Sequence, residues 1–277
     1  MPELPEVETT MRGISPLLKQ QVQQVIIRHP TLRWPIPSHL NTTLAQLTLT
    51  RLSRRAKYIV AEFCRADGSL VGNLILHLGM SGRICLLAHD EPAAKHDHFE
   101  IHFVQGQVMR LRDPRRFGAV LWVDGDAVAD HALIKTLGPE PLELGFTGEY
   151  LYRHTRTRTA PIKTTIMDSH LVVGVGNIYA SESLFRAGIN PKTAANKVSK
   201  VKCERLVAEI KATLAEAIEA GGSSLRDFFG VDGNPGYFQQ TYFVYGRTGE
   251  SCRNCQKPIT QIKQGQRSTF YCSQCQR

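Results

Sequence analysis

Two Cys-x2-Cys pairs close the sequence, and they constrain its fold more than any other feature. Four of the seven cysteines lie in the last 26 residues, with 16 residues between the pairs: Cys252, Cys255, Cys272 and Cys275. Each pair can bend around one metal ion, and two pairs make a closed tetrahedral site. Four thiolates with no open position predict one structural zinc ion. The alternative, two disulfides, is disfavoured by the cytoplasmic character argued below.

The segment that carries this zinc site is basic throughout. Residues 251–277 contain no Asp or Glu but several cations: Arg253, Lys257, Lys263, Arg267 and Arg277. A small metal-pinned hairpin with this charge is suited to lie against phosphates. A solvated basic tail is the alternative, but a bound metal implies that the segment is held in shape.

The whole chain is also basic. Its 34 Lys and Arg against 25 Asp and Glu give a formal net charge of +9, which favours an anionic partner. Nucleic acid is the first candidate and an anionic membrane surface the second. The sequence contains no stretch of 18 or more apolar residues, so no membrane span is predicted. Its acidic N-terminus has no features of a secretory signal. We therefore expect a cytoplasmic protein in which Cys64, Cys85 and Cys203 are reduced core thiols.

Hydrophobic periodicity divides the 277 residues into regions. A helical pattern covers residues 3–18, and short β-like runs follow, which predict a sandwich or barrel. The runs cover residues 44–52, 58–63, 70–78, 99–104, 108–111 and 119–123. Residues 136–150 resemble a linker. Helices are then expected at 177–187, and from an N-cap at Ser199 to the glycines 221 and 222. The fold class predicted is therefore α+β.

Other polar clusters leave alternatives open. Acid-free basic windows at 41–61 and 153–163 fit either a solvated face or a phosphate-tracking groove. Gly174-Val175-Gly176-Asn177 could bring a helix N-terminus to a phosphate, or Asn177 could be an ordinary N-cap. His96-Asp97-His98 suits a strand, with His98, Glu100 and His102 on one face, better than it suits a metal pair.

Several motifs, in order over nearly the whole chain, resemble the formamidopyrimidine-DNA glycosylase family. They are Met1-Pro2-Glu3-Leu4-Pro5-Glu6-Val7-Glu8-Thr9, Arg54-Arg55-Ala56-Lys57-Tyr58, His77-Leu78-Gly79-Met80-Ser81-Gly82, Asp113-Pro114-Arg115-Arg116-Phe117-Gly118, Val173-Gly174-Val175-Gly176-Asn177-Ile178-Tyr179-Ala180-Ser181-Glu182 and the four-cysteine finger.

The resemblance implies a bifunctional DNA repair enzyme. Residues 1–135 would be a catalytic β-sandwich flanked by helices, 151–240 a helix–two-turn–helix DNA-binding domain and 241–277 the zinc finger. Oxidised purines, chiefly 8-oxoguanine and formamidopyrimidines, would be excised from duplex DNA, and the abasic strand would then be cleaved. A monomer suits a single lesion without two-fold symmetry. The resemblance also implies a bacterial, cytoplasmic enzyme that associates with the nucleoid by binding its DNA.

The nucleophile implied is the secondary amine of Pro2, exposed once Met1 is removed. An α-amino group has a pKa of about 8, against about 10.4 for lysine, so more of it is neutral at pH 7. Attack on C1′ gives an iminium, which permits β- and then δ-elimination. By family role Glu3 shuttles protons, although a first-turn acid is also common at helix starts. Lys57 serves the β-elimination and Arg267 the δ-elimination.

Family match also assigns the DNA contacts. Met80, Arg115 and Phe117 would fill the space left by the flipped base. His96, Arg115 and Arg158 would contact DNA, with Lys163 and Asn177 as further phosphate ligands. The loop at 223–238 would close over the lesion.

Two alternative functions are also consistent with the sequence. The sister endonuclease VIII type removes oxidised pyrimidines with the same proline chemistry. The Leu4-Pro5-Glu6 signature and the Met80, Arg115 and Phe117 set favour the purine branch. A non-catalytic zinc-finger DNA-binding protein explains the charge and the cysteines. It gives no reason for Pro2-Glu3 at the extreme N-terminus.

Overall fold

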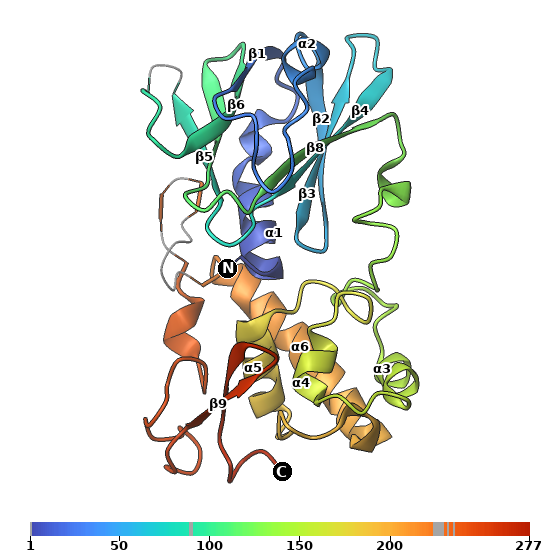
Figure 1. Ribbon diagram of the computed structural model, residues 1–277, viewed down its shortest axis with the longest axis vertical. Helices are drawn as coiled ribbons and strands as arrows, with labels where there is room; N and C mark the ends of the chain where they lie inside the picture. Colours follow the sequence, from blue (N-terminus) through green and yellow to red (C-terminus); the bar gives the residue numbers. More distant parts are fainter. Residues whose placement is uncertain (1, 89–90, 224–229, 232, 235) are drawn as a thin grey trace. The chain divides into compact units, whose positions relative to one another are not determined.

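The computed structural model describes the whole chain except residues 1, 89–90, 224–229, 232 and 235. The chain divides into two compact units (Figure 1). The N-terminal unit is Met1–Lys135 with Ala220–Tyr237, and the C-terminal unit is Thr136–Glu219 with Phe238–Arg277. Among the described residues, no helix is both long and apolar enough to cross a membrane.

The N-terminal unit is a β-sandwich with a helix at its start. One antiparallel sheet has the strand order β1-β6-β7-β5, and the other has β2-β3-β4-β8. The strands are β1 (Val22–Ile27), β2 (Thr48–Arg55), β3 (Tyr58–Cys64), β4 (Leu70–His77), β5 (Arg83–Ala88), β6 (Asp97–Phe103), β7 (Gln107–Arg112) and β8 (Ala119–Asp124). Buried side chains from both sheets, such as Phe63 and Phe103, share one core.

The helices of this unit are short. They are α1 (Leu4–Gly13), α2 (Leu40–Thr43) and the 3-10 turns η1 (Ser15–Leu17) and η2 (Val128–Asp130). The helix expected over residues 3–18 is therefore wrong at its C-terminal end. Pro16 has no N–H and its ring clashes with the preceding turn, so the chain continues as a 3-10 turn.

The C-terminal unit is helical and carries a β-hairpin. Its elements are α3 (Gly148–Thr155), α4 (Ile162–Ile166), α5 (Asn177–Arg186), η3 (Ala195–Lys197), α6 (Lys200–Glu219), η4 (Phe238–Thr241), β9 (Thr260–Gln264) and β10 (Arg267–Tyr271). Helix α3 begins inside the region expected as a linker, because the Thr147 hydroxyl accepts the Tyr150 N–H at 3.0 Å. The N-cap predicted at Ser199 is confirmed by its acceptance of the Lys202 N–H at 3.3 Å.

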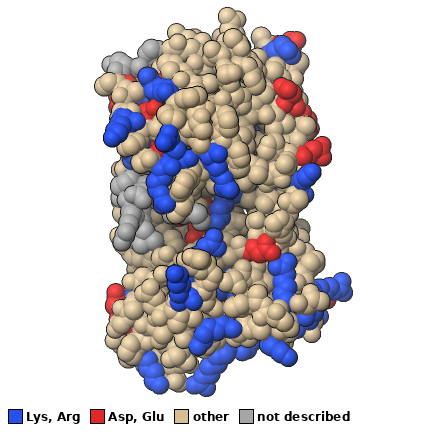
Figure 2. All heavy atoms as spheres, in the orientation of Figure 1, with Lys and Arg blue, Asp and Glu red and all other residues tan. Residues whose placement is uncertain are grey.

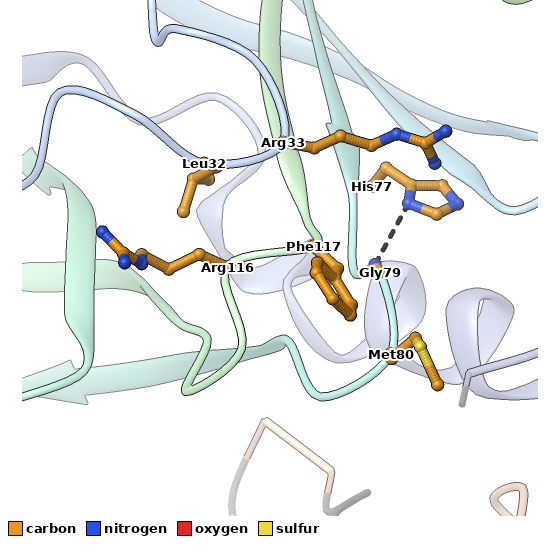
Figure 3. Close-up of a pocket in the computed structure, with 7 residues that line it drawn as sticks. All are labelled: Leu32, Arg33, His77, Gly79, Met80, Arg116 and Phe117. Atoms are coloured by element: carbon orange, nitrogen blue, oxygen red, sulfur yellow. Dashed lines mark hydrogen bonds between the residues drawn. The ribbon is translucent and has the colours of Figure 1, made fainter.

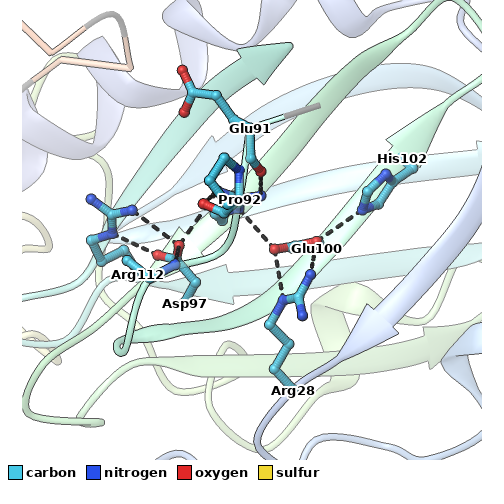
Figure 4. A network of polar contacts seen from close by, with 9 residues as sticks. Arg28, Glu91, Pro92, Asp97, Glu100, His102 and Arg112 are labelled. Atoms are coloured by element: carbon cyan, nitrogen blue, oxygen red, sulfur yellow. Dashed lines mark hydrogen bonds and ion pairs between the residues drawn. The ribbon is translucent and has the colours of Figure 1, made fainter. Parts of the chain in front are cut away.

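A buried network of charges crosses strands β6 and β7 (Figure 4). The Glu100 carboxylate meets the guanidinium groups of Arg28 and Arg110 at 2.8 Å each, and the His102 ring at 2.8 Å. Asp97 pairs with Arg112 at 2.6 Å. Unpaired charges are costly to bury, so each carboxylate here has at least one cationic partner.

The same network fixes the connection that precedes β6. Arg110, only 1% exposed, donates to the carbonyl oxygens of Glu91 at 2.8 Å and Pro92 at 3.2 Å. The Asp97 carboxylate also accepts the Ala94 N–H at 2.7 Å. The described residues just before His96 are thus held by hydrogen bonds to two buried side chains, Arg110 and Asp97.

Candidate functional site

Pro2 and Glu3 are both buried where helix α1 begins, with Glu3 as its N-cap. Glu6, one turn further along, accepts the Glu3 N–H at 2.8 Å and the Ser223 N–H at 2.8 Å through its two carboxylate oxygens. Glu6 therefore orders the backbone of Glu3. A carboxylate at a helix start is also favoured by the helix dipole.

Lys57 lies in the tight turn between β2 and β3, where Arg55 faces Tyr58. The turn needs a left-handed residue, and Ala56 supplies it with a φ of 55°. Arg54 ties this turn to α1: its guanidinium pairs with Glu8 at 2.8 Å and donates to the Ala56 carbonyl at 3.0 Å. The base of the Lys57 side chain is thereby fixed relative to helix α1, whose N-cap Glu3 follows Pro2.

Met80 and Phe117 sit on two loops whose backbones touch. A Cβ on Gly79 would lie 2.4 Å from the Phe117 carbonyl carbon, so only glycine allows this approach. Both apolar side chains stay exposed, at 38% for Met80 and 44% for Phe117, and the Arg115 guanidinium lies 4.8 Å from the Phe117 ring centroid. Exposed apolar wedges beside a cation can enter a base stack.

Asp113, which is fully buried, holds these two loops together. Its carboxylate accepts the Ser81 hydroxyl at 2.7 Å and the Gly118 N–H at 2.8 Å. The His98 ring bonds the Asp113 carbonyl at 2.9 Å, so strand β6 supports the same loop. The wedge residues are thus carried by a braced rather than a free loop.

A pocket of about 620 Å³ adjoins the wedge (Figure 3). Its lining residues are Leu32, Arg33, His77, Gly79, Met80, Arg116 and Phe117. Burial, together with the charges of Lys57 and Arg33, lowers the pKa of His77 to about 4. The neutral ring has Nδ1 3.0 Å from the Gly79 N–H, which leaves the proton on Nε2.

Arg33 was not singled out from the sequence. It stands alone in an irregular segment, outside the basic windows, so charge clustering could not reveal it. The structure places its guanidinium on the pocket wall, beside His77 (Figure 3).

The four cysteines of the C-terminal hairpin form the metal centre expected from their spacing. Their sulfur atoms all lie within 4.8 Å of one another, with Cys252 and Cys275 3.8 Å apart and Cys255 and Cys272 3.4 Å apart. Four sulfurs each about 2.3 Å from a tetrahedral zinc ion would be about 3.8 Å apart. The donor set therefore fits one structural zinc, confirming the predicted ligands.

Helix α5 begins at Asn177, as expected from the sequence. Gly176 is the N-cap and Asn177 is already helical, so the alternative in which Asn177 is an ordinary N-cap is wrong. Its side-chain amide instead donates to the Ser268 carbonyl at 2.9 Å and accepts from Lys163 at 2.6 Å. Lys163 and Asn177 thus bond each other and both contact the Ser268 carbonyl of the zinc hairpin.

The remaining expected contact residues lie on separate elements. His96 is half-buried directly before β6, Arg158 pairs with Asp168 at 2.7 Å, and Arg267 is exposed where β10 begins. Half of the capping loop expected at 223–238 lies outside the described residues, namely 224–229, 232 and 235. On the face drawn in Figure 2, lysine and arginine side chains appear on both units, and aspartate and glutamate are sparse.

A β-sandwich that starts with a buried Pro-Glu pair, and a helical unit with a four-cysteine zinc hairpin, define a class of zinc-containing nucleic-acid enzyme. Three family profiles match in order along the chain. They are the formamidopyrimidine-DNA glycosylase N-terminal domain at 1–120, the formamidopyrimidine-DNA glycosylase H2TH domain at 137–229 and the zinc finger found in FPG and IleRS at 249–277. The chain belongs to the formamidopyrimidine-DNA glycosylase family.

Individual relatives agree with this assignment. The formamidopyrimidine-DNA glycosylase of Methylobacillus flagellatus is 63% identical and aligns with 100% of this chain and 96% of its own length. A Lactococcus lactis FPG variant bound to Fapy-dG-containing DNA is 34% identical, with a TM-score of 0.91 and full coverage of both chains. The Lactococcus lactis Fpg bound to abasic-site DNA is 33% identical, with a TM-score of 0.91 and 99% coverage of both chains.

Proposed function

We propose that this protein is a DNA glycosylase and abasic-site lyase of base excision repair, acting on oxidised purines in duplex DNA. 8-Oxoguanine and formamidopyrimidines are its proposed targets. The observation that carries the proposal is the buried Pro2-Glu3 start of α1, whose backbone Glu6 orders. A protein that only binds DNA has no use for this arrangement. The relatives bound to Fapy-dG and abasic-site DNA support it.

In the proposed reaction the N-terminal amine of the mature chain, which begins at Pro2, attacks C1′ of the damaged nucleotide. The new carbon–nitrogen bond forms as the bond from C1′ to the base breaks. Glu3 supplies a proton to the sugar ring oxygen as the ring opens. The iminium then makes a 2′ proton acidic, and its removal expels the 3′ phosphate. Lys57 assists this β-elimination, and Arg267 assists the δ-elimination that expels the 5′ phosphate.

The wedge and the basic residues would hold the distorted duplex. Met80 and Phe117 would enter the space left by the flipped base while Arg115 bonds the unpaired partner base. His96 and Arg158 would contact the DNA backbone. Residues 1–135 are proposed as the catalytic domain, 151–240 as the helix–two-turn–helix domain after a linker at 136–150, and 241–277 as the zinc finger. The enzyme is proposed to act as a cytoplasmic monomer.

Borohydride trapping tests the proposal. With sodium borohydride, the protein is expected to cross-link to an 8-oxoguanine duplex but not to an undamaged duplex. A competing 8-oxoguanine duplex should suppress the cross-link more strongly than a thymine glycol duplex. A preference for thymine glycol would indicate the oxidised-pyrimidine branch, and binding without any cross-link would leave only a DNA-binding protein.

A further inference from the structure

Lys163 in helix α4 has an unusual environment for a lysine. Its side chain is buried, with only 1% of the residue exposed. Lysine is almost never buried this deeply unless its charge is satisfied by partners. The hydrogen-bond partners of the ammonium group therefore indicate its role.

The ammonium group donates to several protein oxygens. Among them are the Asn177 side-chain oxygen at 2.6 Å, the Ser268 carbonyl at 3.0 Å and the Thr269 hydroxyl at 2.8 Å. A lysine ammonium has three protons and no more. These bonds use all of them, so a DNA phosphate could be contacted only if one of the bonds broke.

Two of these acceptors, Ser268 and Thr269, lie on strand β10 next to Arg267. The Ser268 carbonyl also accepts the Asn177 amide at 2.9 Å, so one peptide oxygen is held from both α4 and α5. Arg267 itself is exposed, where β10 follows a turn formed by Gly265 and Gln266 with φ of 51° and 67°. A hairpin tip of this kind has little core of its own, and the buried ammonium anchors it to the helices.

We infer that Lys163 is a positioning residue: it fixes the backbone beside Arg267 rather than binding DNA itself. The inference rests on the role of Arg267 in δ-elimination proposed above. Displacing a catalytic group by about 1 Å can cost about 100-fold in rate. Loss of the anchor should therefore slow δ-elimination much more than base excision.

The test is a double-mutant cycle with Lys163→Met and Arg267→Ala, assayed on an 8-oxoguanine duplex. Lys163→Met alone should lower the ratio of δ- to β-elimination product by about 10- to 100-fold, while the excision rate changes by less than about threefold. In the Arg267→Ala background it should lower the ratio no further, since residues acting through one group are not additive. Lys211→Met, on helix α6, removes the same charge and should leave the ratio unchanged.

The salt dependence of binding separates positioning from direct phosphate binding. Removing one cation that neutralises a phosphate reduces the slope of log affinity against log salt by about 0.9. The slope should therefore be the same for the Arg267→Ala variant and for the Lys163→Met/Arg267→Ala double variant. A slope reduced by about 0.9, an unchanged product ratio in Lys163→Met, or an additive double variant would each overturn the inference.

A milder variant guards against misfolding of Lys163→Met. Thr269→Val removes one acceptor at almost constant shape and should lower the product ratio, whereas Thr269→Ser keeps the hydroxyl and should preserve it. Equal ratios in Thr269→Val and Thr269→Ser would contradict the anchor. If the wild-type protein excises the base but yields no δ product, the role of Arg267 fails and the inference falls with it; no excision at all overturns the proposed function.

Discussion

At the scale of single residues, the brace at Asp113 matters because its carboxylate satisfies donors from both wedge loops. Asp113→Asn would turn an N–H toward one of these buried donors. We expect the free energy of unfolding to fall by about 1–3 kcal/mol, the usual cost of a buried donor left unsatisfied. Urea denaturation measures the loss.

The matched control is Asp67→Asn in the exposed turn before β4. This carboxylate also accepts two hydrogen bonds, from the Ser69 N–H at 2.9 Å and hydroxyl at 2.6 Å, but in water. No comparable loss is expected there. Equal destabilisation by both variants would show that burial of Asp113 contributes nothing.

His77 gives a prediction about protonation. Its pKa of about 4 lies below the ordinary histidine value of about 6.5, chiefly because of burial. The unfolded chain therefore takes up this proton first, and the contribution of His77 to stability falls as pH drops from about 6.5 toward 4. Nitrogen-15 NMR should find the ring neutral at pH 6, with its proton on Nε2. Titration near 6.5 would contradict the environment described.

At the scale of elements, the charge network on β6 and β7 predicts a pH profile. Burial raises the pKa of Glu100 and of Asp97, but hydrogen bonds and nearby arginines outweigh it, so both pKa values lie below their usual range. Their stabilisation is then complete above the unfolded pKa values of about 4 and is lost as pH falls through the folded ones.

Arg110 pairs with Glu100 at 2.8 Å and with Asp97 at 3.4 Å, so Arg110→Met would leave two buried carboxylates with one fewer cation. We expect a loss of about 3–5 kcal/mol at pH 7, and a flatter dependence of stability on pH between 5 and 3. Arg65→Met, at an exposed turn, should change neither quantity. If the free energy of unfolding of Arg110→Met still fell steeply between pH 5 and 3, the network would not be the source of this pH dependence.

The same scale shows what could be predicted from the sequence. Six strands follow apolar runs, but β1 and β5 were missed. In β1 the sequence Val22-Gln23-Gln24-Val25 does not alternate, because the pairing register shifts between Val22 and Gln24 and both glutamines are exposed. Local motifs predicted the zinc cysteines, whose clustering confirms them, whereas the role of Pro2-Glu3 stays a prediction. The anchor at Lys163 depends on a hairpin more than 100 residues away in the sequence, and only tertiary structure reveals it.

At the scale of the whole molecule, the zinc ion holds a hairpin whose core is small. The buried cluster around the cysteines includes Val244, Ile259 and Phe270. Metal binding then supplies much of the free energy that folds this segment. The protein should contain one zinc per chain by atomic emission. Zinc removal by a thiol-reactive mercurial, later reversed by dithiothreitol and added zinc, should abolish and then restore DNA affinity. Affinity retained without zinc would contradict a structural role.

The central claim is that the chain's own N-terminal proline forms the covalent intermediate with deoxyribose. Mass spectrometry of the borohydride-reduced complex, digested to peptides, tests it most directly. The account predicts that the sugar remnant is attached to the peptide beginning at Pro2, with Met1 removed. Attachment to Lys57 or any other side chain would contradict it.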